Sequence, residues 1–157
     1  MESKILDPCE SVQLKERYGG KTIVLTNGCF DLVHVGHVRY LAAAKRLGDI
    51  LVVGLNGDAS VRELKGEGRP INSEQDRAEL LVALEMVDHV VIFGEKRITR
   101  LVKELQPQVY AKGGDYTVES LNQEEVVALK EIGAQIEILP LVPEKSTTHL
   151  IKAMQGP

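Results

Sequence analysis

The chain is poor in aromatic residues, with four Tyr, two Phe and no Trp among its 157 residues, so its core must be mainly aliphatic. Its two cysteines, Cys9 and Cys29, are too few for a disulfide framework and indicate free thiols in a reducing compartment. The start of the chain lacks the apolar core of a signal peptide. No apolar run approaches the roughly 18 residues that cross a bilayer. We therefore expect a cytoplasmic protein without membrane association.

The chain also lacks a long basic run, and its formal net charge is −4. This balance disfavours a general nucleic-acid or membrane-surface binder. A nucleotide enzyme would need its positive charges placed locally instead. The length fits one domain and is sufficient to bury a core without disulfides or metals, so we expect a single domain over residues 1–157.

Strand-like and helix-like patterns alternate along the chain. Five strands are predicted, at 22–26, 50–55, 89–93, 109–111 and 135–139. Helical patterns lie between them, at about 36–47, 73–85, 98–105 and 126–132, and a last helix begins near residue 146. This order predicts an α/β fold: a single Rossmann-like domain with a five-stranded, mostly parallel sheet and helices on both faces. Such sheets bind ligands beyond the carboxyl ends of their strands, so functional residues should follow strands.

The segment after the first strand, residues 27–37, carries the strongest signal. It places His34 and His37 at the start of a helix, with Gly36 between them. A helix N-terminus offers unpaired N–H groups and the positive end of the helix dipole, which suits phosphate. Gly36 would let a phosphate approach the backbone, and both imidazoles can hydrogen-bond phosphate oxygens. We therefore expect a phosphate site here.

Two other interpretations of these histidines are weaker. Each could be a packed or solvated side chain with no functional role. A zinc site built from Cys29, His34 and His37 would lack a fourth ligand nearby, because Cys9 is distant in sequence and structural zinc normally takes four. We expect no metal site made by the protein alone, and Cys29 is most simply a small residue packed under the loop.

Three more segments follow predicted strands and carry polar or glycine residues. They contribute Asn56, Arg69 and Arg77 after the second strand, Lys112, Gly113, Gly114 and Asp115 after the fourth, and Ser146, Thr147 and Thr148 after the fifth. The arginines could reach a triphosphate or a phosphosugar, although surface arginines usually face solvent. The paired glycines suggest close approach of a ligand, with a tight turn as the alternative. The hydroxyls can bind phosphate or simply cap the last helix.

The motifs together resemble those of the nucleotidylyltransferase superfamily. Gly28-Cys29-Phe30-Asp31 resembles the Gly-x-Phe-Asp segment of its cytidylyltransferase-like branch, and residues 34–37 match the His-x-Gly-His signature. With Lys-Gly-Gly-Asp-Tyr and Ser-Thr-Thr, the resemblance spans a core of about residues 22–153. It is greatest to the heptose 1-phosphate adenylyltransferases, which make ADP-heptose for bacterial lipopolysaccharide. Lys145 departs from the apolar or small residue found there in many relatives.

Residues 1–20 match no family motif, so they form an N-terminal extension that could provide an extra helix or an oligomer contact. In the family, the adenylyltransferase often occurs as one domain of a bifunctional protein with a sugar kinase. No kinase-like segment occurs here, so the resemblance implies a stand-alone form. It also implies a homodimer, since homodimers are common in related enzymes.

The resemblance implies transfer of a nucleoside monophosphate from ATP to a sugar 1-phosphate, with release of pyrophosphate. Magnesium would be bound through the nucleotide phosphates, since it prefers phosphate and water oxygens. His34, His37 and Lys45 are the expected catalytic residues. Expected at the nucleotide are Asn27, Gly28, Cys29, Phe30, Gly36, Lys112, Gly113, Gly114, Asp115, Ser146, Thr147 and Thr148. Expected at the phosphosubstrate are Asp31, Asn56, Arg69 and Arg77.

Two rival functions stay open. One is a CTP-dependent cytidylyltransferase that acts on glycerol 3-phosphate or a similar alcohol phosphate, because base recognition often uses backbone groups that the sequence does not reveal. The other is a non-catalytic nucleotide sensor on the same fold. Base preference separates the first from the adenylyltransferase, and pyrophosphate release separates the second.

Overall fold

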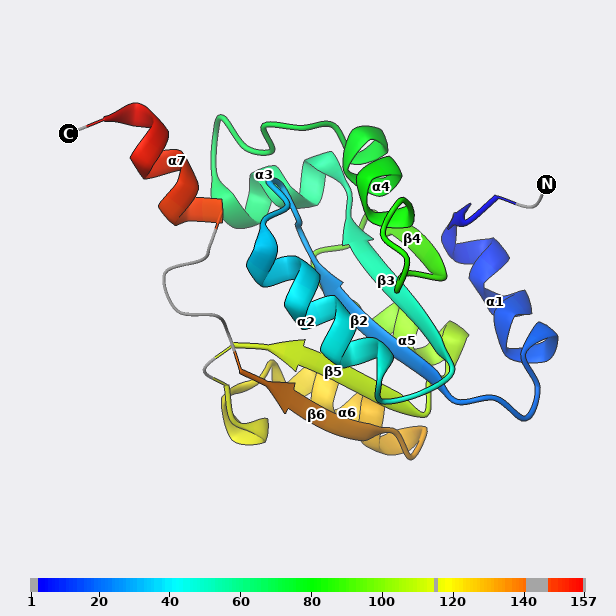
Figure 1. Ribbon diagram of the computed structural model, residues 1–157. Helices are drawn as coiled ribbons and strands as arrows, with labels where there is room; N and C mark the ends of the chain where they lie inside the picture. The colour runs from blue at the N-terminus through cyan, green and yellow to red at the C-terminus, as the bar shows by residue number, and fades with distance from the viewer. Residues whose placement is uncertain (1–2, 115, 141–146, 157) are drawn as a thin grey trace.

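A parallel sheet forms the centre of the computed structural model, which describes residues 3–114, 116–140 and 147–156 (Figure 1). The sheet has six strands in the order β1-β4-β3-β2-β5-β6, and every neighbouring pair is parallel. The strands are β1 (Ile5–Leu6), β2 (Ile23–Gly28), β3 (Ile50–Asn56), β4 (His89–Phe93), β5 (Val109–Gly113) and β6 (Gln135–Leu139). The predicted α/β, Rossmann-like fold is therefore confirmed. The expected count of five strands is wrong by one, because β1 was not foreseen.

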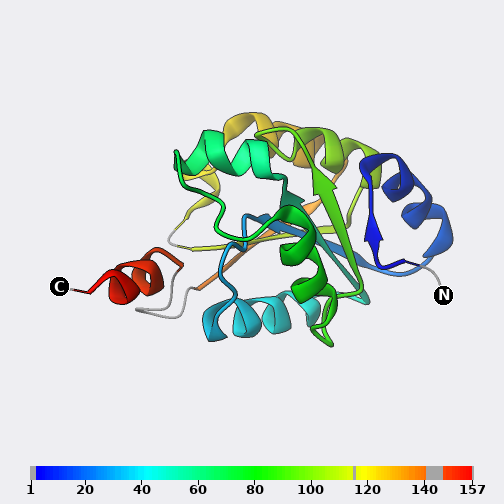
Figure 2. The same ribbon diagram turned by 90° about the horizontal axis from the view of Figure 1, so that it is seen from above.

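Helices cover both faces of the sheet, as Figure 2 shows, with α2 and α4 on one face and α1, α3, α5 and α6 on the other. The helices are α1 (Pro8–Arg17), α2 (Val35–Lys45), α3 (Asp58–Lys65), α4 (Glu74–Val82), α5 (Thr99–Leu105), α6 (Gln123–Glu131) and α7 (Thr147–Gln155), with a 3-10 turn, η1, at Val118–Ser120. The last helix, α7, lies beyond the carboxyl edge of the sheet (Figure 1).

Two aliphatic clusters fix these layers. One joins α1, α5 and α6 to the sheet through side chains such as Leu14, Leu101 and Leu129, and the other joins α2 and α4 through Leu41 and Leu81. The central strand β3 is buried at all seven positions, which explains its uninterrupted apolar sequence. Tyr110 and Phe93 are the aromatic members of the first cluster, and the remaining members are mostly aliphatic, as the composition predicts.

The strand order reverses beside β2. From β2 the chain runs outward through β3 to β4, and α5 then returns it to β5 on the other side of β2. The carboxyl ends of β2 and β5 therefore diverge into a crevice, which is where sheets of this type bind ligands. Residues of the segment 27–37 flank that crevice together with Lys112, Gly113 and Tyr116, so the topology brings two of the predicted site segments together.

The N-terminal extension packs against the far edge of the sheet. Ile5 and Leu6 pair with Val90 and Val91 of β4, and Asp7 caps α1 in a capping box with Glu10. The expectation of an extra helix in residues 1–20 is thus confirmed. A strand of only two residues carries no periodic signal in the sequence, which is why β1 was not predicted. It forms because the edge of β4 would otherwise be unpaired.

Candidate active site

A cleft opens at the reversal of strand order and has a volume of about 470 Å³. Its lining combines the expected segments after β2 and β5 with groups from α3, the β4–α5 connection, α6 and α7. The lining residues are Asn27, Gly28, Cys29, Phe30, Asp31, His34, Gly36, His37, Tyr40, Asn56, Leu64, Lys65, Arg69, Lys96, Arg97, Lys112, Gly113, Tyr116, Glu125 and Thr148. A cavity of this size suits a small-molecule ligand rather than a macromolecular partner.

His34 and His37 close the N-terminus of α2 with their own side chains. Nδ1 of His34 accepts the N–H of Gly36 at 3.1 Å, and Nδ1 of His37 accepts the N–H of His34 at 3.3 Å. The two rings stack with their centroids 3.9 Å apart. A neutral imidazole that accepts at Nδ1 carries its proton on Nε2. Both rings are therefore held as Nε2–H donors at a helix N-terminus.

The charge state of His37 follows from its surroundings. Burial, and then the neighbouring His34, lower the pKa of His37 from 6.5 to about 4. The ring also packs against Phe30, with centroids 5.1 Å apart. Without a ligand, His37 is thus a neutral hydrogen-bond donor near neutral pH, not a cation. An anion bound at Nε2 would favour the protonated form.

Two glycines let aromatic rings close the floor of the cleft. A Cβ at Gly28 would lie 2.9 Å from the Phe30 ring, and one at Gly113 would lie 3.0 Å from the Tyr40 ring. Phe30 adopts the left-handed conformation, with φ 46°, which is costly for a residue with a side chain. Tyr40 donates to the carbonyl of Ala111 at 3.0 Å and also contacts the Thr26 hydroxyl. The floor at the β2–β5 crevice therefore depends on glycine at both positions.

Asp31 holds the loop that follows α3. Its carboxylate accepts the N–H groups of Ile71 and Asn72 and pairs with Arg69 Nε at 2.7 Å. Burial raises the pKa of Asp31, but the hydrogen bonds from Asn72, Ile71 and Arg69 outweigh it and lower the pKa overall. Asp31 and Arg69 both line the cleft, as expected, yet the Asp31 carboxylate serves the loop, so its expected contact with the phosphosubstrate gains no support.

Arg77 is buried rather than presented to a ligand. It is 0% exposed, and its guanidinium donates to the carbonyls of Cys29, Asn56 and Asn72 and pairs with Asp58 at 2.8 Å. Arg77 is not among the described residues that line the cleft. The expectation that Arg77 contacts the phosphosubstrate is therefore corrected. The buried Arg77 side chain instead connects the segment after β2 with the segment after β3 through its hydrogen bonds.

Lys45 is likewise misassigned by the sequence. It lies eight residues beyond His37, which is about 12 Å along a helix axis at 1.5 Å per residue. There its ammonium pairs with Asp88 at 2.5 Å and donates to the carbonyl of Asp49. The phosphate site at the N-terminus of α2 is out of its reach, so we withdraw its catalytic role.

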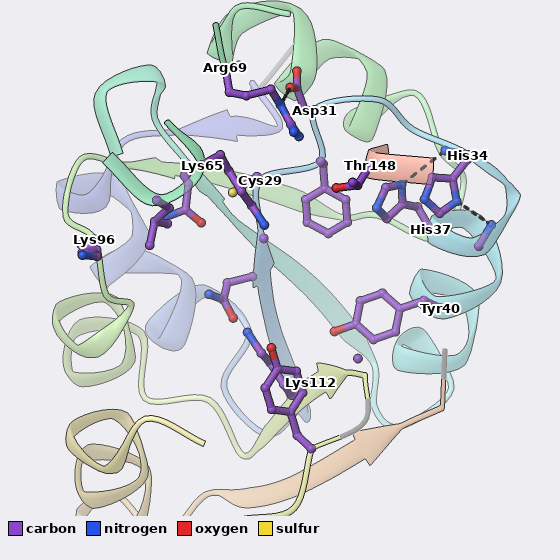
Figure 3. Close-up of a pocket in the computed structure, with 18 of the residues that line it drawn as sticks. Cys29, Asp31, His34, His37, Tyr40, Lys65, Arg69, Lys96, Lys112 and Thr148 are labelled. Carbon is purple, nitrogen blue, oxygen red and sulfur yellow. Dashed lines mark hydrogen bonds and ion pairs between the residues drawn. The ribbon is translucent and has the colours of Figure 1, made fainter. Parts of the chain in front are cut away.

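Other cations line the cleft instead. Figure 3 shows Lys65 and Lys96 on the side of the cleft opposite His34, His37 and Thr148, and Arg97 belongs to the same lining. Sequence reasoning missed all three. Lys96 and Arg97 follow β4, so the rule that functional residues follow strands would have found them. Lys65 ends α3, a helix that has one side chain in the core and is therefore hard to recognise.

The remaining expected residues have mixed outcomes. Asn27, Cys29, Gly36, Asn56, Lys112 and Thr148 line the cleft, so the structure brings them together. Gly114 has φ 133° and donates its N–H to the carbonyl of Leu139, so it lies against the end of β6. Thr147 begins α7. Asp115 and Ser146, like Lys145, lie outside the described residues.

This geometry agrees with a comparison of the chain with known families, in which the model described as cytidylyltransferase-like matches residues 25–153. The chain belongs to the cytidylyltransferase-like family. The match includes the histidines of α2 and both glycines of the cleft floor. The resemblance inferred from the motifs is thus confirmed, and the protein is a nucleotidyltransferase.

Curated proteins are similar to this chain over most of its length. "Bifunctional protein HldE" of Geotalea uraniireducens is 51% identical over 152 residues, which are 97% of this chain and 31% of that protein. The protein of the same name from Syntrophotalea carbinolica is 52% identical over 137 residues, 87% of this chain and 28% of its own length. The chain thus spans about a third of the curated relatives that it matches.

Solved structures confirm the fold. The lipopolysaccharide core biosynthesis protein of Thermoplasma volcanium superposes with a TM-score of 0.64 at 28% identity, covering 78% of this chain and 98% of that one. Pantoate-beta-alanine ligase of Francisella tularensis reaches 0.56 at 13% identity, covering 96% of this chain and 76% of its own, so it shares the fold alone. No helix in the described ranges is both long and apolar enough to cross a membrane.

Proposed function

We propose that the protein transfers AMP from ATP to heptose 1-phosphate, giving ADP-heptose and pyrophosphate for lipopolysaccharide core synthesis. The observation that carries this proposal is the Nε2–H donor of His37 at the N-terminus of α2, in a cleft whose opposite side holds Lys65 and Lys96. The 51% identity to a "Bifunctional protein HldE" and the match to a lipopolysaccharide core biosynthesis protein support the choice of substrate.

The chemistry asks mainly for alignment and charge compensation. A phosphate oxygen of the sugar phosphate attacks the α-phosphorus of ATP, a new P–O bond forms, and the bond to the β-phosphate breaks to release pyrophosphate. The attacking phosphate is already ionised near neutral pH, so it needs no general base. Charge grows on the α-phosphate oxygens in the transition state, and a fixed donor there stabilises it selectively. We assign that role to Nε2–H of His37.

The two sides of the cleft divide the substrates between them. The triphosphate would lie along the N-terminus of α2, where His37 and Thr148 offer donors and His34 holds the helix start in place. The phosphate of the sugar would lie toward Lys65, Lys96 and Arg97, which would offset the repulsion between the two anions. This differs from the expectation from sequence, which gave that task to Arg69 and Arg77.

Magnesium would arrive with the nucleotide. The Asp31 carboxylate is engaged by the loop at 69–72, which leaves Glu125 as the one other carboxylate among the described lining residues. Within the described ranges, no group of three His, Cys, Asp or Glu side chains could hold a metal ion. The ion would therefore be held by phosphate oxygens and water and would neutralise the charge of the triphosphate.

A second candidate is a cytidylyltransferase that acts on glycerol 3-phosphate or a similar alcohol phosphate. The matching family favours this candidate, because its model is described as cytidylyltransferase-like. The same histidines and cations would serve CTP equally well. The non-catalytic sensor differs from both in releasing no pyrophosphate.

Pyrophosphate release across a grid of ATP or CTP against heptose 1-phosphate or glycerol 3-phosphate, with magnesium, tests the proposal. We expect signal with ATP and heptose 1-phosphate. His37→Ala should lower kcat by about 100-fold or more, as loss of a transition-state donor does. Arg39→Ala, an exposed change on the same helix, is the control and should keep full turnover. Signal with CTP and glycerol 3-phosphate alone would overturn the substrate assignment, and silence with bound nucleotide would favour the sensor.

A further inference from the structure

Glu125 is a buried acid in a cleft whose other charged lining residues, apart from Asp31, are basic. It lies in the first turn of α6, is 7% exposed, and lines the same cleft as His37 and Lys96. One carboxylate oxygen accepts the N–H of Ile98 at 3.3 Å. Acidic side chains are almost never buried without partners, and a carboxylate repels phosphate. Its place here therefore calls for a ligand group that is not an anion.

Two donors accompany this carboxylate. Burial lowers the pKa of Lys112, while the charge of Glu125 acts in the opposite direction, so the two groups interact. Tyr110 donates its hydroxyl to Oδ1 of Asn27 at 2.6 Å, which leaves the NH₂ group of Asn27 as the part that can meet a ligand. Asn27 and Lys112 both line the cleft. Glu125, Asn27 and Lys112 thus combine one strong acceptor with two donors.

Hydroxyl groups match this combination. A hydroxyl donates one hydrogen bond and accepts others, so neighbouring hydroxyls can donate to Glu125 while accepting from Lys112 and Asn27. Phosphate oxygens would satisfy the two donors but would be repelled by the acid. The hydrogen bond ties Glu125 to Ile98, in the segment that also carries Lys96 and Arg97. Figure 3 shows Lys96 on the side of the cleft away from the histidines.

We propose that Glu125, Lys112 and Asn27 bind the hydroxyl groups of the phosphosugar and so select a polyhydroxylated substrate over a plain alcohol phosphate. This inference rests on the proposed function. Tyr110 acts as a positioning residue, because its hydroxyl orients the Asn27 amide. The ribose of the nucleotide also carries hydroxyl groups. The KM values for heptose 1-phosphate and for ATP distinguish binding of the sugar hydroxyls from binding of the ribose hydroxyls.

The test is steady-state kinetics of Glu125→Gln with ATP, magnesium and heptose 1-phosphate, varying each substrate in turn. Glutamine keeps the shape and can still accept from Ile98, but it loses the charge. We expect KM for heptose 1-phosphate to rise roughly 10-fold, with kcat and KM for ATP changed less than about 2-fold, as loss of substrate binding predicts. Glu124→Gln makes the same change at the exposed neighbouring position and should match the wild type.

The outcomes separate cleanly. Unchanged KM for heptose 1-phosphate in an active, folded Glu125→Gln protein overturns the inference and leaves the proposed function intact. A rise in KM for ATP that disappears with 2′-deoxy-ATP assigns Glu125 to the ribose and also overturns it. If Glu125→Gln does not fold, Asn27→Ala provides the same comparison. A wild type without turnover of heptose 1-phosphate overturns the proposed function, and this inference with it.

Discussion

The ring of His37 stacks on that of His34 with centroids 3.9 Å apart, and each ring accepts a backbone N–H from the first turn of α2 or the residue before it. The helix start is thus capped by imidazoles instead of the usual Ser, Thr, Asp or Asn. Because each Nδ1 accepts a backbone N–H, each neutral ring carries its proton on Nε2. A second proton would have to go on Nδ1 and would break the cap, which couples the charge of the rings to the local structure.

The first prediction concerns the protonation of His37. Its pKa in the folded protein is about 4, below the 6.5 of an unperturbed histidine, because burial and then His34 disfavour the charged form. The unfolded state therefore binds more protons between these values. The contribution of His37 to stability is complete above pH 6.5 and is lost as pH falls toward 4. NMR titration of the ring should give a midpoint near 4 without ligand and a higher one with magnesium-ATP; a midpoint near 6.5 in the free protein would contradict the neutral-donor assignment.

The second prediction concerns Arg77. Arg77→Met would leave one buried carbonyl, two partly buried carbonyls and Asp58 without their donor, and we expect a loss of about 2–4 kcal/mol in the free energy of unfolding. The upper end is discounted because the Asp58 side chain is 36% exposed. Arg100→Ala removes an arginine whose side chain is 53% exposed and should cost at most about 1 kcal/mol. Urea denaturation of both variants makes the comparison; equal losses would show that Arg77 is not a structural tie.

The third prediction concerns Lys45. Lys45→Ala should keep wild-type kcat and KM, because the side chain pairs with Asp88 far from the N-terminus of α2. The pair is partly exposed, so the free energy of unfolding should fall by no more than about 1 kcal/mol. Pyrophosphate release and thermal denaturation on the same preparation provide both numbers. A tenfold fall in kcat at unchanged stability would return Lys45 to the list of phosphate contacts.

The fourth prediction concerns the cations opposite the histidines. Lys65→Ala and Lys96→Ala should each raise KM for the phosphosubstrate by roughly 3- to 10-fold, and the effect should shrink as salt screens exposed charges. Lys103→Ala, an exposed lysine on α5 outside the cleft lining, serves as the matched control. Kinetics at low and high ionic strength measure the effect. If KM for ATP rises in place of KM for the phosphosubstrate, the assignment of the two sides of the cleft is reversed.

The fifth prediction concerns the cleft floor. Gly113→Ala would place a methyl group 3.0 Å from the Tyr40 ring, which its hydroxyl bonds to Ala111 and Thr26 hold in place. Because the ring cannot easily move, we expect a destabilisation of about 1–3 kcal/mol. Gly94→Ala adds the same methyl group where no heavy atom lies within 4 Å and should be close to neutral. Denaturant melts of the two variants compare them; similar midpoints would mean that the floor can adjust.

Much of the fold was accessible from local sequence. Strands β3, β4 and β6 are runs of apolar or alternating residues whose bounds match the prediction within one residue, and Gly133, with φ 73°, follows α6 as expected. The placing of His34 and His37 at a helix start also follows from local order, because a strand, a short loop and a helix are adjacent in the chain. These features depend on near neighbours, which is why the sequence determined them.

The tertiary structure decided which charged side chains meet. Arg77 is buried because carbonyls from two distant loops converge on it, and Lys45 points away because eight helical residues separate it from the phosphate site. Lys65, Lys96 and Glu125 come from three separate elements and share one cleft only because parallel strands end at the same edge. The sequence determines which residues carry a charge. Whether a charged side chain is buried, and with which group it pairs, depends on contacts between segments far apart along the chain.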